Sequence, residues 1–99
     1  MNASMRSYLA ECFWPGVQHA DLHELDSRAI TRLTLSGAQH VCYRGSMLMP
    51  DDEVVFCFFE ATSAAAVEAA ARNAGIPFAR IVASTGMPDT PIPPGRSTT

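Results

Sequence analysis

The sequence predicts one α+β domain of ferredoxin-like βαββαβ topology, a four-stranded antiparallel sheet with two helices on one face. Extended apolar segments and helical periodicities alternate along the chain in that order, and a tight turn joins the two central extended segments. The 99 residues fit one domain. We place this domain at residues 7–84 and expect a flexible, proline-rich tail at 85–99.

The first half of the domain predicts a strand and a helix. Residues 8–13 are apolar except for Glu11, and a Pro-Gly pair ends this segment. Apolar residues then recur at spacings of three and four, which is typical of one helical stripe: Leu22, Leu25, Ala29, Ile30 and Leu33. Asp21, with a glutamate three residues later, resembles a capping box, and a cap two or three residues earlier is the alternative. Gly37 is the expected end of the helix.

The second half predicts a hairpin, a second helix and a last strand. Residues 39–49 and 53–60 read as strands joined by a Pro-Asp-Asp turn, and Gly45 weakens the first strand or marks a bulge. An alanine-rich helix at 64–74 follows hydroxyl residues that can cap it. A short strand at 80–84 completes the sheet.

The central strands are apolar on both faces, which predicts a homodimer. One face of the 53–60 strand carries Val54, Phe56 and Phe58, and the other carries Val55, Cys57 and Phe59. Two helices cover only one face, and monomers seldom expose such an apolar patch. We therefore expect a second copy to pack sheet on sheet, in the manner of a dimeric α/β barrel. The alternative is that the tail or the helix ends cover that face.

Composition excludes several classes of function. Hydrophobic residues make up 47% of the chain and charged residues 17%, which indicates a folded globule. The formal net charge is -3 and no basic run occurs, so we expect no nucleic-acid partner. The longest apolar stretch, residues 54–59, is too short to span a membrane.

Cysteine usage and the start of the chain predict a cytoplasmic protein. The three cysteines, Cys12, Cys42 and Cys57, have no disulfide or metal-site spacing, so we expect three buried, reduced thiols. Residues 1–7 contain no apolar core of a secretory signal.

Glu11 is a carboxylate in an otherwise apolar central strand. Such a group must be paired, hydrogen-bonded or placed in a wet cavity. One interpretation is an ion pair with Arg44 or Arg80. The other is a polar anchor in a ligand pocket between subunits, with His40 and Arg44 as further ligand-binding residues. His40, Cys42 and Arg44 alternate along one side of a strand expected at the sheet edge, where solvated side chains are the simpler interpretation.

His19 and His23 form the candidate metal site. Imidazoles four residues apart on a helix face the same way and can share a transition metal, and Asp26 follows on that side. The alternative is two solvated residues at the start of a helix. No complete catalytic or metal-binding motif is present in the sequence.

Three long stretches resemble a known family: residues 8–16, 44–61 and 74–81. They are similar to a family of small bacterial proteins of unknown function that includes a nickel-binding protein with a ferredoxin-like fold. The resemblance covers residues 7–84 and implies a ferredoxin-like dimer. It also raises binding of a divalent transition metal, nickel in particular, as an expectation.

These observations rank three functions. The first is a dimeric binding protein that holds a metal ion or small ligand. The second is a structural or regulatory protein whose tail contacts a protein partner. The third is a cofactor-independent enzyme of the dimeric α/β-barrel type, which rests on fold analogy alone. Binding of a ligand or a protein partner therefore ranks above catalysis.

Overall fold

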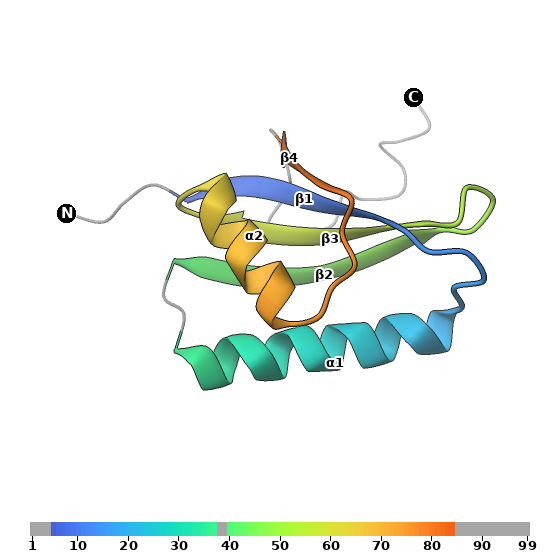
Figure 1. Ribbon diagram of the computed structural model, residues 1–99, viewed down its shortest axis with the longest axis horizontal. Helices are drawn as coiled ribbons and strands as arrows, with labels where there is room; N and C mark the ends of the chain where they lie inside the picture. Colours follow the sequence, from blue (N-terminus) through green and yellow to red (C-terminus); the bar gives the residue numbers. More distant parts are fainter. Residues whose placement is uncertain (1–4, 38–39, 85–99) are drawn as a thin grey trace, which may run out of the picture.

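The computed structural model describes residues 5–37 and 40–84, and these residues have the predicted ferredoxin-like order (Figure 1). The six elements are β1 (Arg6–Phe13), α1 (His19–Ser36), β2 (Val41–Met49), β3 (Val54–Ala61), α2 (Ala64–Asn73) and β4 (Arg80–Ser84). Each boundary lies within two residues of its predicted position, apart from the start of α1. The predicted flexible tail at 85–99 lies outside the described residues.

The four strands form one antiparallel sheet in the order β2-β3-β1-β4. The strand β1 pairs with β3 from Arg6 opposite Ala61 to Phe13 opposite Val54, and with β4 from Ser7 to Glu11. The strand β2 lies at an edge, as predicted, and a bulge interrupts its pairing between Tyr43 and Gly45. Gly45 has a φ of 125°, which a residue with a side chain rarely adopts, so the glycine permits the bulge.

The start of α1 corrects the predicted cap. The helix begins at His19 with Gln18 as its N-cap, so Asp21 is the third helical residue and not the cap. The Asp21 carboxylate accepts a 2.8 Å hydrogen bond from the Gln18 amide, the back-reaching bond of a capping box. The alternative of a cap three residues earlier is therefore correct. Gly37 ends the helix in the left-handed conformation, as predicted.

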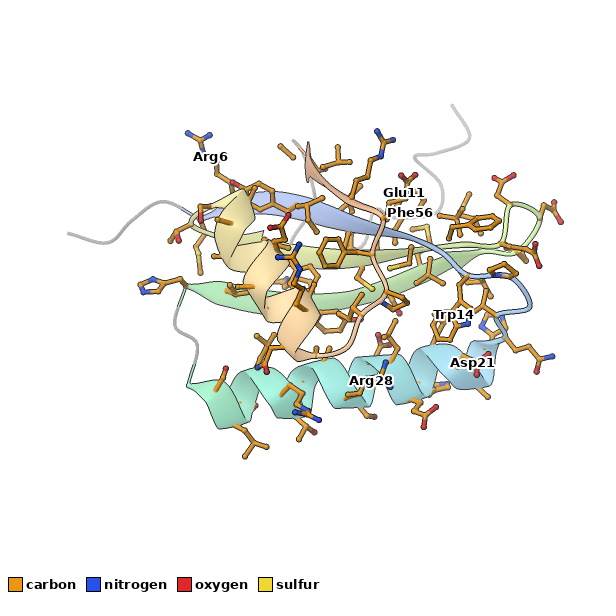
Figure 2. The ribbon with its side chains drawn as sticks, viewed as in Figure 1. Arg6, Glu11, Trp14, Asp21, Arg28 and Phe56 are labelled. Atoms are coloured by element: carbon orange, nitrogen blue, oxygen red, sulfur yellow. The ribbon has the colours of Figure 1, made fainter. Side chains whose placement is uncertain are left out.

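The core lies between the sheet and the two helices. Its strand residues alternate as predicted: Tyr8, Ala10 and Cys12 from β1, and Val55, Cys57, Phe59 and Ala61 from β3. Leu25 and Ala29 of α1 and Val67 and Ala71 of α2 cover them. Arg28 ties the helices together, because its Nε donates a 2.8 Å hydrogen bond to the Ala74 carbonyl just beyond α2 (Figure 2).

The opposite side of the sheet, which we call the open face, carries the alternate residues. Its apolar members are Leu9, Phe13, Met47, Met49, Val54, Phe56, Phe58 and Val82. Phe13 is 62% exposed, Met47 48% and Met49 40%, so no described residue of the same chain covers this patch. Neither helix has the length and apolar content needed to cross a membrane.

Candidate functional site

Glu11 lies on the open face and forms an ion pair. The Arg80 Nε donates to a Glu11 carboxylate oxygen at 2.6 Å, across the β1–β4 pairing. The Glu11 side chain keeps 29% of its surface exposed. The ion-pair interpretation is thus the one that the geometry supports, with Arg80 and not Arg44 as the partner.

Arg44 lies on the same face but near the other edge of the sheet. Its Nη1 is 3.1 Å from a carboxylate oxygen of Glu60 on β3. Because β3 separates β2 from β1, the two ion pairs flank the apolar centre of the open face from opposite sides. Glu11 and Arg44 therefore share a face without meeting. His40 is exposed just before β2, and its carbonyl accepts the Thr62 amide at 3.1 Å.

His19 and His23 occupy the first turns of α1, and both are exposed. The helix begins at His19, so the spacing of four residues does place the two imidazoles on one side of the helix. Asp26 does not join them, because it is half-buried and turned to the sheet. Within residues 5–37 and 40–84, no three histidine, cysteine or acidic side chains lie close enough together to hold a metal ion.

The cysteines divide into two kinds. Cys12 and Cys57 are buried on adjacent strands, and all three thiols are free. The hydrogen bond with Cys12 and then burial raise the pKa of the Cys57 thiol. A thiol of raised pKa is a poor nucleophile, which agrees with the inert core thiol expected at Cys57. The same hydrogen bond lowers the pKa of the Cys12 thiol. Cys42 corrects the prediction of three buried thiols, because it is exposed on the edge strand β2.

A hydrogen-bonded cluster under α1 joins the helix to β2. The Asp26 carboxylate accepts from the Tyr43 hydroxyl at 2.5 Å and from the Ser46 hydroxyl at 2.8 Å. Burial, followed by the nearby Cys57 and Asp26, raises the pKa of Tyr43. No sequence pattern predicts this cluster. A polar Asp26 at the edge of the apolar stripe of α1 was the one available indication.

We expect Tyr43→Phe to destabilise the fold by about 2 kcal/mol at neutral pH, because a hydrogen bond to a carboxylate is lost. The raised pKa makes this contribution fall above pH 10. Above pH 10 the tyrosine of the unfolded chain loses its proton while folded Tyr43 keeps it. The free energy of unfolding therefore falls by about 1.4 kcal/mol per pH unit. Urea unfolding between pH 7 and 11 measures both effects.

Tyr8→Phe is the matched control for this prediction. It removes the same atom from a tyrosine of the core whose hydroxyl has no hydrogen bond within the described residues. We expect a loss of folding free energy below 1 kcal/mol at neutral pH. Equal losses in the two variants would show that the link from Tyr43 to Asp26 does not stabilise the fold.

The geometry defines a small α+β protein with an apolar sheet face and two exposed imidazoles at the start of α1. The family model for the SCO4226-like nickel responsive proteins matches residues 8–83. The chain belongs to this family, which confirms the resemblance found in the sequence.

A solved structure has the same fold. The crystal structure of SCO4226 from Streptomyces coelicolor A3(2) superposes with a TM-score of 0.67 at 17% sequence identity, covering 83% of this chain and 99% of that one. This likeness confirms the ferredoxin-like fold. Comparison with curated proteins found no match.

Proposed function

We propose that this chain is a small nickel-binding protein that acts as a homodimer in the cytoplasm. The pair of exposed imidazoles at the start of α1 carries the proposal, since it offers nitrogen ligands of the kind that nickel prefers. Membership of a nickel responsive family supports the choice of metal. The three free thiols support a reducing compartment.

The charges around the imidazoles bear on the binding of a cation. The N-terminus of a helix carries a partial positive charge, which disfavours a metal ion by about 0.3–1 kcal/mol. Asp21 and Glu24 lie in the same first turns and offset this charge. His19 and His23 supply two ligands, and water or a second copy completes the coordination.

Titration calorimetry with nickel tests this assignment on the protein without a histidine tag. We expect the His19→Ala and His23→Ala variants each to weaken nickel binding at least tenfold, because a two-imidazole site loses half of its protein ligands. His40→Ala is the matched control, as an exposed histidine beyond the opposite end of α1 from His19, and should bind nickel as the wild type does. Unchanged uptake in both α1 variants would reject this site.

The open face supports the homodimer. Four strands, with eight residues in each central strand, cover about 500 Å² in projection. Protruding side chains raise the accessible area toward the roughly 800 Å² per partner of a standard interface. The two ion pairs give the face two positive and two negative charges, so it carries no net charge to repel its own copy.

Glu11, His40 and Arg44 remain the predicted residues for a small ligand between the subunits. Glu11 and Arg44 meet one requirement, since both lie on the face that a second copy would cover. Each is engaged by a residue of its own chain, so a ligand there must exchange an existing ion pair. We therefore rank metal binding at α1 above this site.

A further inference from the structure

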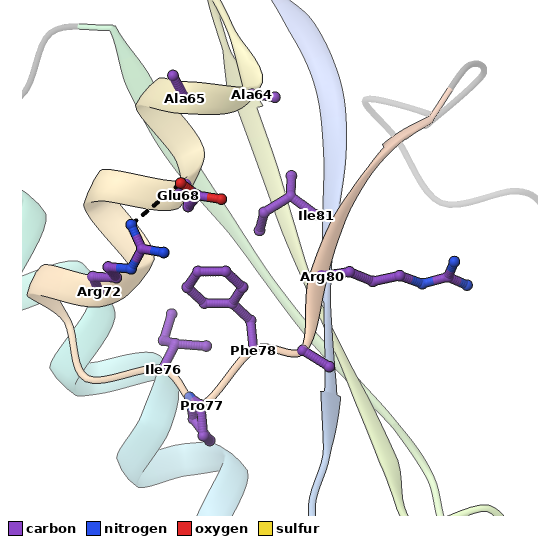
Figure 3. Close-up of a pocket in the computed structure, with 10 residues that line it drawn as sticks. Ala64, Ala65, Glu68, Arg72, Ile76, Pro77, Phe78, Arg80 and Ile81 are labelled. Atoms are coloured by element: carbon purple, nitrogen blue, oxygen red, sulfur yellow. Dashed lines mark hydrogen bonds and ion pairs between the residues drawn. The ribbon is translucent and has the colours of Figure 1, made fainter.

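A groove between α2 and β4 lies away from both the imidazole pair and the open face. It has a volume of about 690 Å³, within the range of small-molecule sites. Figure 3 shows its walls, with Glu68 and Arg72 on the α2 side, Ile81 on the β4 side and Phe78 between them. Its lining is thus mixed, with the charged side chains of Glu68 and Arg72 on one wall and apolar side chains opposite.

Arg72 is the cation of this groove. Its guanidinium carbon is 5.6 Å from the centre of the Phe78 ring, a cation–π contact. Its Nη1 is 3.2 Å from the Glu68 carboxylate, and no other hydrogen bond engages the guanidinium among the described residues. Because a guanidinium carries five N–H donors, most of them are free for a ligand.

Arg80 does not contribute its charge, although its backbone borders the groove. Its side chain points away from Phe78 in Figure 3 and pairs with Glu11 on the open face. Arg72 therefore supplies the positive charge of the groove, whereas Arg80 lies at the proposed dimer interface.

We propose that this groove binds a small monocarboxylate with a flat apolar body. The carboxylate accepts two hydrogen bonds from Arg72, and the apolar body packs between Phe78 and Ile81. Glu68 offsets the positive charge of Arg72, so an anion without an apolar body binds weakly in the groove. The apolar body of the ligand supplies the remaining affinity. A ligand carboxylate displaces Glu68 from Arg72 at little cost in free energy, because both side chains are largely exposed, at 46% and 68%.

The test is a titration of the full-length protein with 3-phenylpropionate, followed by amide proton–nitrogen correlation spectra. We expect saturable shifts in residues 64–81, in the low-millimolar range for a ligand of this size. Arg72→Gln should weaken binding about tenfold, because a charged hydrogen-bond donor is lost. Arg32→Gln, at an exposed arginine of α1, is the matched control and should leave binding unchanged.

Two further probes separate charge from apolar contact. The neutral 3-phenylpropanamide should bind the wild type weakly, with about the affinity of 3-phenylpropionate for Arg72→Gln. Acetate, which lacks the apolar body, should give no saturable shift. Equal binding of acetate, equal binding to Arg72→Gln, or no saturable shift with 3-phenylpropionate would each overturn the proposal. None of these outcomes depends on nickel, so the test stands apart from the metal site.

Discussion

We expect Leu9→Lys to convert the protein from a dimer to a monomer. Leu9 lies on a central strand of the open face, opposite Phe58 on one side and Val82 on the other. In a sheet-on-sheet dimer, its lysine ammonium would lose water without gaining a carboxylate directly opposite. An unpaired buried charge costs several kcal/mol, and each 1.4 kcal/mol weakens association tenfold. Analytical ultracentrifugation across a range of protein concentrations measures the change.

Leu35→Lys controls for the substitution itself. Leu35 is 78% exposed on α1, on the other side of the molecule from the open face, so the same change there should leave the dimer intact. A wild-type protein that remains monomeric at micromolar concentration would contradict the dimer. Dissociation of Leu35→Lys instead of Leu9→Lys would place the interface on the helices. Circular dichroism of both variants verifies that the fold is retained.

The elements of this fold could be predicted because their determinants are local. Strict alternation along β3 separates Phe58 from Phe59, and a period near 3.6 marks the buried side of α1 through Leu25 and Ala29. The helix end at Gly37 follows from one residue and its left-handed backbone. The cap of α1 was misplaced because an acid at Asp21 serves either as N-cap or as third residue, and sequence alone does not distinguish them.

The sites depend on contacts between distant segments and were harder to predict. Asp26 meets Tyr43 and Ser46 only once α1 has packed on β2, so a prediction from spacing along the helix assigned it to the imidazoles instead. Glu11 had two arginines as candidate partners, and only the pairing of β1 with β4 selects Arg80. The imidazole pair, by contrast, needs only helical geometry. Both side chains are exposed at the start of α1, and metal binding there stays a prediction.

The groove at Arg72 also depends on how distant segments pack, so spacing along the sequence does not predict it. Arg72 and Glu68 are a routine ion pair one helical turn apart, which the sequence contains and which alone indicates no site. The groove exists because the segment from Ile76 to Phe78 carries the chain from α2 to the edge of the sheet. No periodicity describes that loop.

Neighbouring phenylalanines on β3 should differ sharply in what they stabilise. Phe59 is 1% exposed in the core, with its ring edge-on to Tyr43 at 5.2 Å, so Phe59→Ala should cost about 3–5 kcal/mol of folding free energy. That is a large part of the 5–15 kcal/mol typical of a domain. Phe58 lies half-buried on the open face, so Phe58→Ala should weaken dimerisation more than it weakens the folding of the single subunit.

Guanidinium unfolding at several protein concentrations separates the two effects. The loss from Phe59→Ala should persist at every concentration, because it arises within one subunit. The loss from Phe58→Ala should shrink below 1 kcal/mol once dilution has dissociated the wild type, because mass action then no longer stabilises the dimer. If Phe59→Ala does not fold, Phe59→Leu gives the same comparison with a smaller cavity. Equal losses at high dilution would show that both faces of β3 are buried within a single chain.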